Sequence, residues 1–166
     1  MTDALDIYDR AMVVIQDYRL DGLYNRDYNS FLLFMKGLLR NSIDLFNGCL
    51  NDLSYTDIEE EETIKTDDNQ DEVVKITHTY FNKDLTFKEQ SILAMIVVYQ
   101  WFEREVQDVK QFSNHLNTRD FKTESSYMNF KQKNEYLDKL REVYLQEINN
   151  YQIENMDALV NEIGGL

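Results

Sequence analysis

Residues 81–102, FNKDLTFKEQSILAMIVVYQWF, decide the fold of this chain. Thr86 and Glu89 have the spacing of a capping box, in which each side chain hydrogen-bonds the backbone N–H of the other at the start of a helix. The run from Ile92 to Tyr99 has no polar face, as in a helix that is buried on all sides. Its β-branched residues would also suit a buried strand. The cap and the length of the apolar run favour a buried central helix.

Two helices are expected before the central one, because apolar side chains recur there three and four residues apart. The first spans about Asp3 to Tyr18, with Thr2 as its cap and Asp21-Gly22 after its end, where glycine suits a left-handed C-terminal cap. The second spans about Tyr28 to Phe46. Gly37 lies in the middle of the second helix and indicates that a neighbouring element approaches closely there.

The central helix continues past Trp101, and we expect it to bend or break between Val106 and Asn114, where the apolar pattern thins. A last helix is expected from about Ser126 to Gln152. Its apolar residues form one stripe along the helix: Phe130, Leu137, Leu140, Tyr144, Ile148 and Tyr151. We expect this stripe to pack on the rest of the bundle and to be essential to the fold.

The sequence between the second and central helices is of a different kind. Residues 73–80 alternate in polarity and are rich in β-branched side chains, as in a strand, and residues 58–64 form a weaker partner. We predict a β-hairpin over about 57–80 with an acidic tip; a disordered acidic loop is the alternative. A two-stranded ribbon alone is marginal in water, so we expect a neighbouring subunit to stabilise it through Glu59, Glu60, Asp67, Asp68, Asp71, Val74 and Ile76.

The composition of the chain fits one acidic, folded domain. It has 166 residues, 43% of them hydrophobic, and a formal net charge of −14. Such a charge argues against binding to nucleic-acid phosphates and to anionic membranes. Cys49 cannot form an internal disulfide, and we expect it to be a small core residue in a helix. We find no secretory signal and no apolar run long enough to span a bilayer, so we expect the protein to be made in the cytoplasm.

No motif in the sequence predicts a metal, a cofactor or a catalytic site. The Glu-x-x-His step of di-iron helical bundles is missing before both His78 and His115. Residues 67–71 resemble the start of a calcium loop, but Glu72 and His78 stand where glycine and a bidentate glutamate are needed. Phosphate-binding and nucleophile motifs are also missing. We therefore expect a protein that is not an enzyme.

Four short motifs stand in a fixed order along most of the chain: Phe81-Asn82-x-Asp84-Leu85-Thr86, Tyr99-x-Trp101-Phe102, Asp120-Phe121-Lys122 and Leu137-Asp138-Lys139-Leu140-Arg141. This order, over about Tyr8 to Tyr151, resembles the head–tail connector, or neck adaptor, proteins of tailed bacteriophages. The resemblance implies a mainly helical virion subunit that assembles into a ring, commonly of twelve copies, beneath the portal. Its partners would be itself, the portal protein and a downstream neck or tail protein. DNA would pass through the channel without specific binding.

We expect the C-terminal residues to form a separate segment. Residues 1–153 would be one helical domain, and residues 154–166 a docking tail. Apolar residues in the tail are spaced for one short amphipathic helix over 155–163, followed by an apolar tip: Met156, Leu159, Val160, Ile163 and Leu166. Such a tail either folds back on its own bundle or binds a partner. Connector proteins anchor to the portal through terminal segments, so the resemblance favours the portal.

The acidic charge also fits a second class of function. A small acidic regulatory binder, such as a DNA mimic, would occupy the binding site of a nucleic-acid enzyme. A mimic should carry rows of carboxylates on ordered elements, whereas the densest cluster here is in the hairpin and the helices are mixed in sign. In either case we expect a mainly α fold: a helical bundle with a buried central helix, a long C-terminal helix and an inserted acidic β-hairpin.

Overall fold

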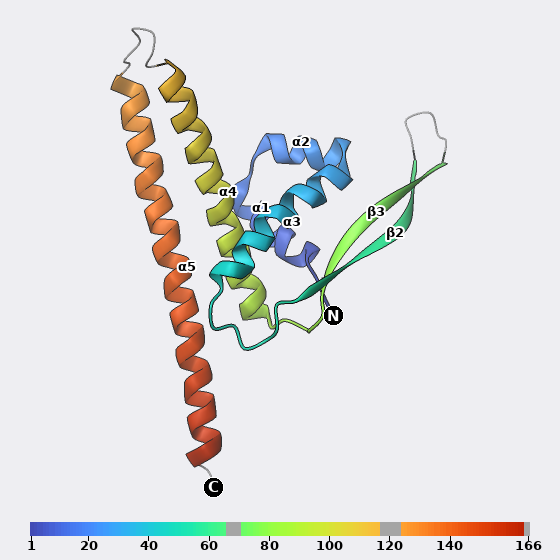
Figure 1. Cartoon of the computed structure of the whole chain (residues 1–166), viewed down its shortest axis with the longest axis vertical. Coiled ribbons are helices and arrows are strands. Elements are labelled where there is room, and N and C mark those ends of the chain that lie inside the picture. The colour runs from blue at the N-terminus through green and yellow to red at the C-terminus, as the bar shows by residue number, and fades with distance from the viewer. Residues whose placement is uncertain (66–70, 117–123, 165–166) are drawn as a thin grey trace.

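A computed structural model describes residues 1–65, 71–116 and 124–164 of the chain (Figure 1). These residues form a mainly helical protein with a small antiparallel sheet, as the sequence predicts. The helices are α1 (Leu5–Ile15), α2 (Tyr18–Arg26), α3 (Tyr28–Leu45), α4 (Phe87–Leu116) and α5 (Glu124–Gly164). The strands are β1 (Thr2–Asp3), β2 (Tyr55–Lys65) and β3 (Asp71–Phe81).

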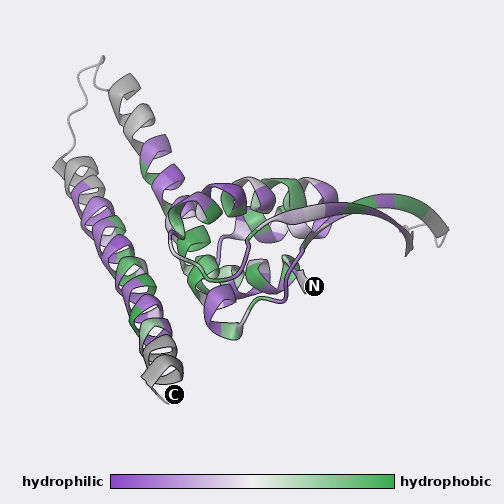
Figure 2. Cartoon of the chain, turned by 60° about the horizontal axis from the view of Figure 1, so that its bottom comes forward, coloured by the Kyte–Doolittle hydropathy of each residue, from purple (hydrophilic) through white to green (hydrophobic). Residues whose placement is uncertain are grey.

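The core is built around α4, which packs against α1, α3 and α5 (Figure 2). Four apolar side chains of α4 are fully buried: Ile92, Leu93, Ile96 and Val97. The predicted buried central helix is confirmed. Its capping box is also present, since the Thr86 N–H donates to the Glu89 carboxylate at 2.7 Å and the Glu89 N–H donates to Thr86 Oγ1 at 3.3 Å.

The expected bend in the central helix is wrong, because α4 continues without interruption to Leu116. The segment between Val106 and Asn114 has few apolar residues, but it contains glutamine and lysine, which form helices well. The thinning of the apolar pattern therefore does not mark the end of the helix.

The predicted first helix, over about Asp3 to Tyr18, corresponds to α1, which is shorter than expected and is followed by a further helix, α2. The α1 helix ends at Ile15, Gln16 adopts a left-handed conformation with φ of 47°, and Asp17 caps α2 by accepting the Arg19 N–H at 2.7 Å. Thr2 is not a helix cap, because it lies in β1, where its hydroxyl oxygen accepts the Leu85 N–H at 2.7 Å. The predicted stop at residues 21–22 is wrong as well, since both lie within α2.

The second predicted helix is confirmed as α3, which begins after Asp27. The Asp27 carboxylate accepts the Ser30 N–H at 3.0 Å and so caps the helix. The expected close approach at Gly37 is wrong within this chain, because no neighbouring atom lies within 4 Å of the place where a Cβ would be. Cys49 is half-buried in the loop after α3 and not in a helix.

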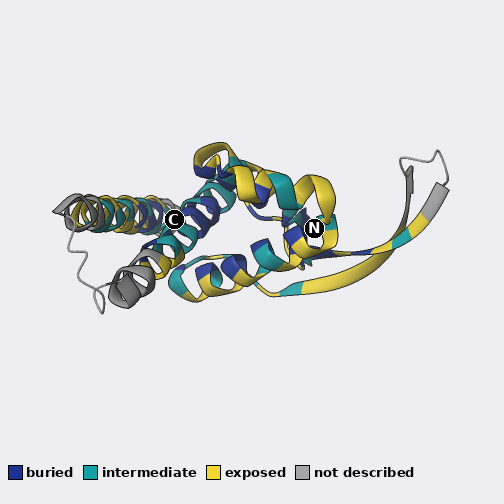
Figure 3. Ribbon diagram, turned by 90° about the horizontal axis from the view of Figure 1, so that it is seen from above, coloured by how far each residue is buried: buried dark blue, intermediate teal, exposed yellow. Residues whose placement is uncertain are grey.

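The predicted hairpin is confirmed in the described residues, and its tip at 66–70 lies outside them. Strands β2 and β3 pair from Tyr55–Phe81 to Lys65–Asp71. Strand β1 pairs with the other edge of β3, a contact that the sequence pattern did not indicate. The base of the ribbon packs on its own bundle, with Ile76, His78, Thr79 and Phe81 buried (Figure 3). The base therefore needs no neighbouring subunit for its packing.

The α5 helix runs antiparallel to α4 along one side of the molecule (Figure 1). Ring pairs join the two helices, with centroids 5.1 Å apart for Tyr99 and Tyr144 and 4.9 Å apart for Phe102 and Tyr136. Of the predicted stripe, Tyr144, Ile148 and Tyr151 are buried, Leu137 and Leu140 are half-buried, and the Phe130 side chain lies outside the described part. The separate tail helix over 155–163 is wrong, since this segment is the end of α5.

Candidate interaction surfaces

The outer part of the β2–β3 ribbon forms an acidic arm, defined here as residues 58–65 and 71–75. It extends away from the helices (Figure 1), and most of its described side chains are exposed (Figure 3). Glu59, Glu60 and Glu61 are all exposed. Lys75 Nζ lies 3.9 Å from Glu61, with both side chains about two thirds exposed at 68% and 67%. Such an exposed ion pair contributes little stability.

The hairpin residues that were predicted to contact a partner differ in how far they are exposed. Glu59 and Glu60 lie on the exposed arm, and Val74 is half-buried. Ile76 is only 1% exposed and belongs to the protein's own core, so its prediction as a partner contact is corrected. Asp71 pairs with Lys65 through its backbone, while its side chain and all of Asp67 and Asp68 lie outside the described residues.

The arm is attached to α3 by polar contacts at its base. Lys36 Nζ donates to the Asp57 carboxylate at 2.5 Å, and the Thr79 hydroxyl donates to it at 2.9 Å. Burial alone would raise the pKa of Asp57, but the hydrogen bonds from Lys36 and Thr79 outweigh it and lower this pKa. Asn29 also donates to the Lys75 carbonyl at 2.7 Å. These contacts fix the orientation of the arm relative to α3.

Glu89 is the centre of a buried polar cluster that holds α5. Its side chain is 1% exposed. Besides the contacts within the capping box, its carboxylate accepts the Tyr151 hydroxyl at 2.6 Å and the Asn51 amide at 2.9 Å. Cys49 Sγ lies 3.4 Å away. The cluster joins the start of α4, the loop between α3 and β2, and α5. The spacing of residues in the sequence predicted only the contacts between Glu89 and Thr86.

The surroundings keep this carboxylate ionised. Burial by itself raises the pKa of Glu89, but hydrogen bonds from Tyr151, Asn51 and Thr86 hold it at about 2. Burial and the nearby Glu89 charge raise the pKa of Cys49 to about 12, so its thiol is protonated at neutral pH and is a poor nucleophile. Burial and the hydrogen bond to Glu89 also raise the pKa of Tyr151. The cluster therefore acts as a clamp between segments of the chain.

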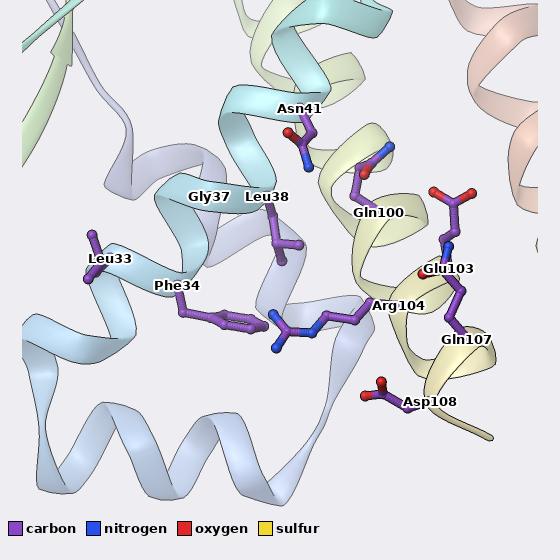
Figure 4. A pocket seen from close by; sticks show the side chains of 10 residues that line it. All are labelled: Leu33, Phe34, Gly37, Leu38, Asn41, Gln100, Glu103, Arg104, Gln107 and Asp108. Atoms are coloured by element: carbon purple, nitrogen blue, oxygen red, sulfur yellow. The ribbon is translucent and has the colours of Figure 1, made fainter. Parts of the chain in front are cut away.

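An open groove lies between α3 and α4 (Figure 4). It has a volume of about 720 Å³ and is lined by Leu33, Phe34, Gly37, Leu38, Asn41, Gln100, Glu103, Arg104, Gln107 and Asp108. The Arg104 guanidinium points toward the Phe34 ring, 4.9 Å from its centre. Leu33 is 71% exposed at the rim. The surface that lines this α3–α4 groove is more polar than apolar.

The end of α5 also presents apolar side chains. Ile153 is 58% exposed and Met156 is 64% exposed. Lys88 Nζ lies 2.5 Å from the Glu154 carboxylate, which places this part of α5 beside the first turn of α4. Leu159, Val160 and Ile163 follow on the backbone of α5, but their side chains lie outside the described residues, as does all of Leu166.

The described side chains contain no group of three or more His, Cys, Asp or Glu that could hold a metal ion. Within the described ranges, none of the helices combines the length and the apolar character that crossing a bilayer requires. Comparisons of the chain with protein-family models, with curated proteins and with solved structures find no match.

Proposed function

We propose that this chain is a head–tail connector subunit of a tailed bacteriophage that assembles into a ring beneath the portal. The observation that carries the proposal is the shape of the subunit: the acidic arm and the end of α5 both extend from one core (Figure 1). A two-stranded ribbon is marginal where nothing packs on it. Projections of this kind bury surface when other molecules pack against them, as neighbouring subunits do in a ring.

The positions of the resembling motifs support the proposal. The segment from Phe81 to Thr86 joins β3 to α4, and its backbone is held by other parts of the chain. The Asn82 N–H donates to the Ser54 carbonyl at 3.0 Å, and the Leu85 N–H donates to Thr2 Oγ1 at 2.7 Å. Leu137 and Leu140, in the motif on α5, pack against the core. These two motifs therefore have packing roles, as expected for a subunit with a structural function.

The proposed ring surrounds a channel through which DNA passes without specific binding. The portal protein would lie on one side of the ring and a downstream neck or tail protein on the other, in the virion. Each subunit has a formal charge of −14, and an acidic wall repels the phosphates of DNA. A repulsive wall suits a channel in which DNA must slide.

Sedimentation velocity and negative-stain microscopy of the full chain, alone and with purified portal protein, test this proposal. We expect a ring of many copies, in solution or on the portal. A monomer or dimer in both conditions would contradict the connector function.

A DNA mimic is the competing function, and one observation favours it. Glu59, Glu60 and Glu61 are exposed on an ordered strand, as a mimic requires. A mimic acts as a monomer or dimer and should compete with DNA for a nucleic-acid enzyme. The same sedimentation experiment therefore separates the two functions.

A further inference from the structure

The two long edges of the β2–β3 ribbon differ in what covers them. The protein itself covers part of the β3 edge: the Ala4 N–H donates to the Thr79 carbonyl at 2.9 Å, and the Asn29 amide donates to the Lys75 carbonyl at 2.7 Å. In the sheet order β1-β3-β2, β2 is an outer strand. Over residues 55–61, no described group hydrogen-bonds the backbone of its outer edge. An unpaired strand edge is a template for pairing with another chain.

The register of the ribbon shows which backbone groups point outward from β2. The Asn82 N–H donates to the Ser54 carbonyl at 3.0 Å, so these residues form a hydrogen-bonded pair at the base of the ribbon. In an antiparallel ladder, such pairs alternate with pairs whose N–H and C=O groups point away from the partner strand. Counted along the register from Ser54, the outward groups belong to Tyr55, Asp57, Glu59 and Glu61.

The charge of β2 determines which strand can pair with this edge. Glu59, Glu60 and Glu61 are exposed, and consecutive residues of a strand point to opposite faces, so both faces of β2 carry negative charge. A second copy that paired through the same edge would place glutamates opposite glutamates, which is destabilising. Lysine or arginine at consecutive positions of an added strand would instead meet an opposite charge on each face. Charge complementarity therefore selects a basic strand of another protein.

The base of this edge is held in place before any partner binds. The Thr56 hydroxyl donates to Asn82 Oδ1 at 2.8 Å, the Asn82 amide donates to Ser54 Oγ at 2.8 Å, and Lys36 donates to Asp57 at 2.5 Å. A strand that is already ordered loses little conformational freedom on binding, so new backbone hydrogen bonds can contribute to affinity.

We propose that the outer edge of β2 binds an extended, basic segment of another protein by strand addition, paired with the outward backbone groups of Asp57, Glu59 and Glu61. The inference goes beyond the proposed ring, because the partner is not a copy of this chain, and it does not depend on ring formation. Main-chain hydrogen bonds would supply affinity, and the charge pairs would supply specificity. Added salt should weaken the binding by screening the charge pairs.

A basic peptide, Thr-Val-Lys-Arg-Lys-Val-Thr, tests the edge when it is titrated into the isotope-labelled full chain and followed by NMR. We expect the amide resonances of Asp57, Glu59 and Glu61 to shift most and their hydrogen exchange to slow. Thr56 and Ile58, whose N–H groups pair with β3, should change little. Replacing the three basic residues of the peptide by glutamine should weaken binding by about tenfold, the effect of three cross-strand charge pairs.

Two matched controls separate backbone pairing from attraction between charges. N-methylation of the peptide at its arginine and at the following lysine keeps the charges and blocks both edges of the added strand, so we expect this peptide not to bind. In the protein, Glu59→Pro removes an outward N–H, whereas Glu59→Ala removes the charge alone. We expect Glu59→Pro to bind the peptide much more weakly than Glu59→Ala. Both variants should keep the melting temperature of the unmodified protein, because Glu59 is exposed and proline is tolerated on an edge strand.

Three results would overturn the inference. If the N-methylated peptide binds as well as the unmodified one, charge alone attracts the peptide and β2 accepts no strand. If the glutamine peptide binds equally well, the partner is not selected by its basic charge. If no peptide shifts the outward amides, the edge is not a binding surface. In each case, ring formation measured by sedimentation still decides the proposed function separately.

Discussion

The two longest helices of the molecule are held in different ways. The α4 helix, of 30 residues, lies in the core and has four fully buried aliphatic side chains among its residues 92–97. The α5 helix, of 41 residues, packs along one stripe, and its buried residues are Tyr144, Ile148 and Tyr151 in the described part. The Tyr151 hydroxyl donates to the buried Glu89 carboxylate. Apolar burial thus holds α4, whereas α5 also depends on a polar clamp.

The largest effect is expected in α4. Ile96→Ala removes a side chain with 0% exposure and should lower the free energy of unfolding by about 2–5 kcal/mol, a large part of the 5–15 kcal/mol of a typical domain. Urea denaturation measures this loss. Val13→Ala is the control, since Val13 is 71% exposed on α1. Equal losses in the two variants would contradict the central position of α4.

The clamp on α5 should depend on pH. The folded pKa of Glu89 is about 2, below its ordinary value of 4.5. The carboxylate therefore stabilises the fold above pH 4.5, and this contribution of about 3 kcal/mol is lost as the pH falls toward 2. Because other carboxylates titrate too, the quantity to measure is the difference in unfolding free energy between the unmodified chain and Glu89→Gln. A difference that stays constant from pH 6 to pH 2 would show that the clamp is not ionic.

A change on α5 tests the same clamp from its other side. Tyr151→Phe removes the hydroxyl that donates to Glu89 at 2.6 Å, and we expect a loss of about 1.5–3 kcal/mol, typical of a hydrogen bond to a charged group. Thermal unfolding measures it, with Tyr136→Phe as the control because Tyr136 is 47% exposed on α5. A Tyr151→Phe variant as stable as the control would mean that ring packing alone holds α5.

The smallest effect concerns the stripe of α5. The sequence pattern predicts a fully buried Leu140, whose replacement by alanine would cost about 2–5 kcal/mol. Leu140 is only half-buried in the structure, so we expect Leu140→Ala to cost about 1 kcal/mol, closer to an average substitution. Chemical denaturation distinguishes the two values, and a loss above about 3 kcal/mol, within the range for a buried leucine, would place Leu140 in the core.

The capping box could be predicted because Thr86 and Glu89 are three residues apart and interact locally. The other partners of Glu89 could not be predicted in this way. Asn51 is 38 residues from Glu89 in the sequence, and Tyr151 is 62 residues from it. Only the packing of α5 and of the loop after α3 brings them together, and nothing in their local sequence indicates it.

The errors near the N-terminus have a different physical cause. Apolar residues continue with helical spacing across Gln16, so the pattern predicts one helix. A single left-handed residue changes the chain direction there without changing that spacing. Gly22 also led to a wrong prediction, because the sequence alone does not distinguish a glycine within a helix, as in α2, from a glycine that follows the end of a helix.

Hydrogen exchange of the full chain, free and assembled on purified portal, tests the central claim most directly. The account predicts that residues 92–99 of α4 exchange slowly in both states. It predicts that the exposed arm, at residues 58–61 and 73–75, and α5 at residues 153–156 exchange faster in the free protein and become protected on assembly. Assembly that leaves both regions unprotected, or that protects only other surfaces, would contradict the claim that these two projections are the assembly contacts.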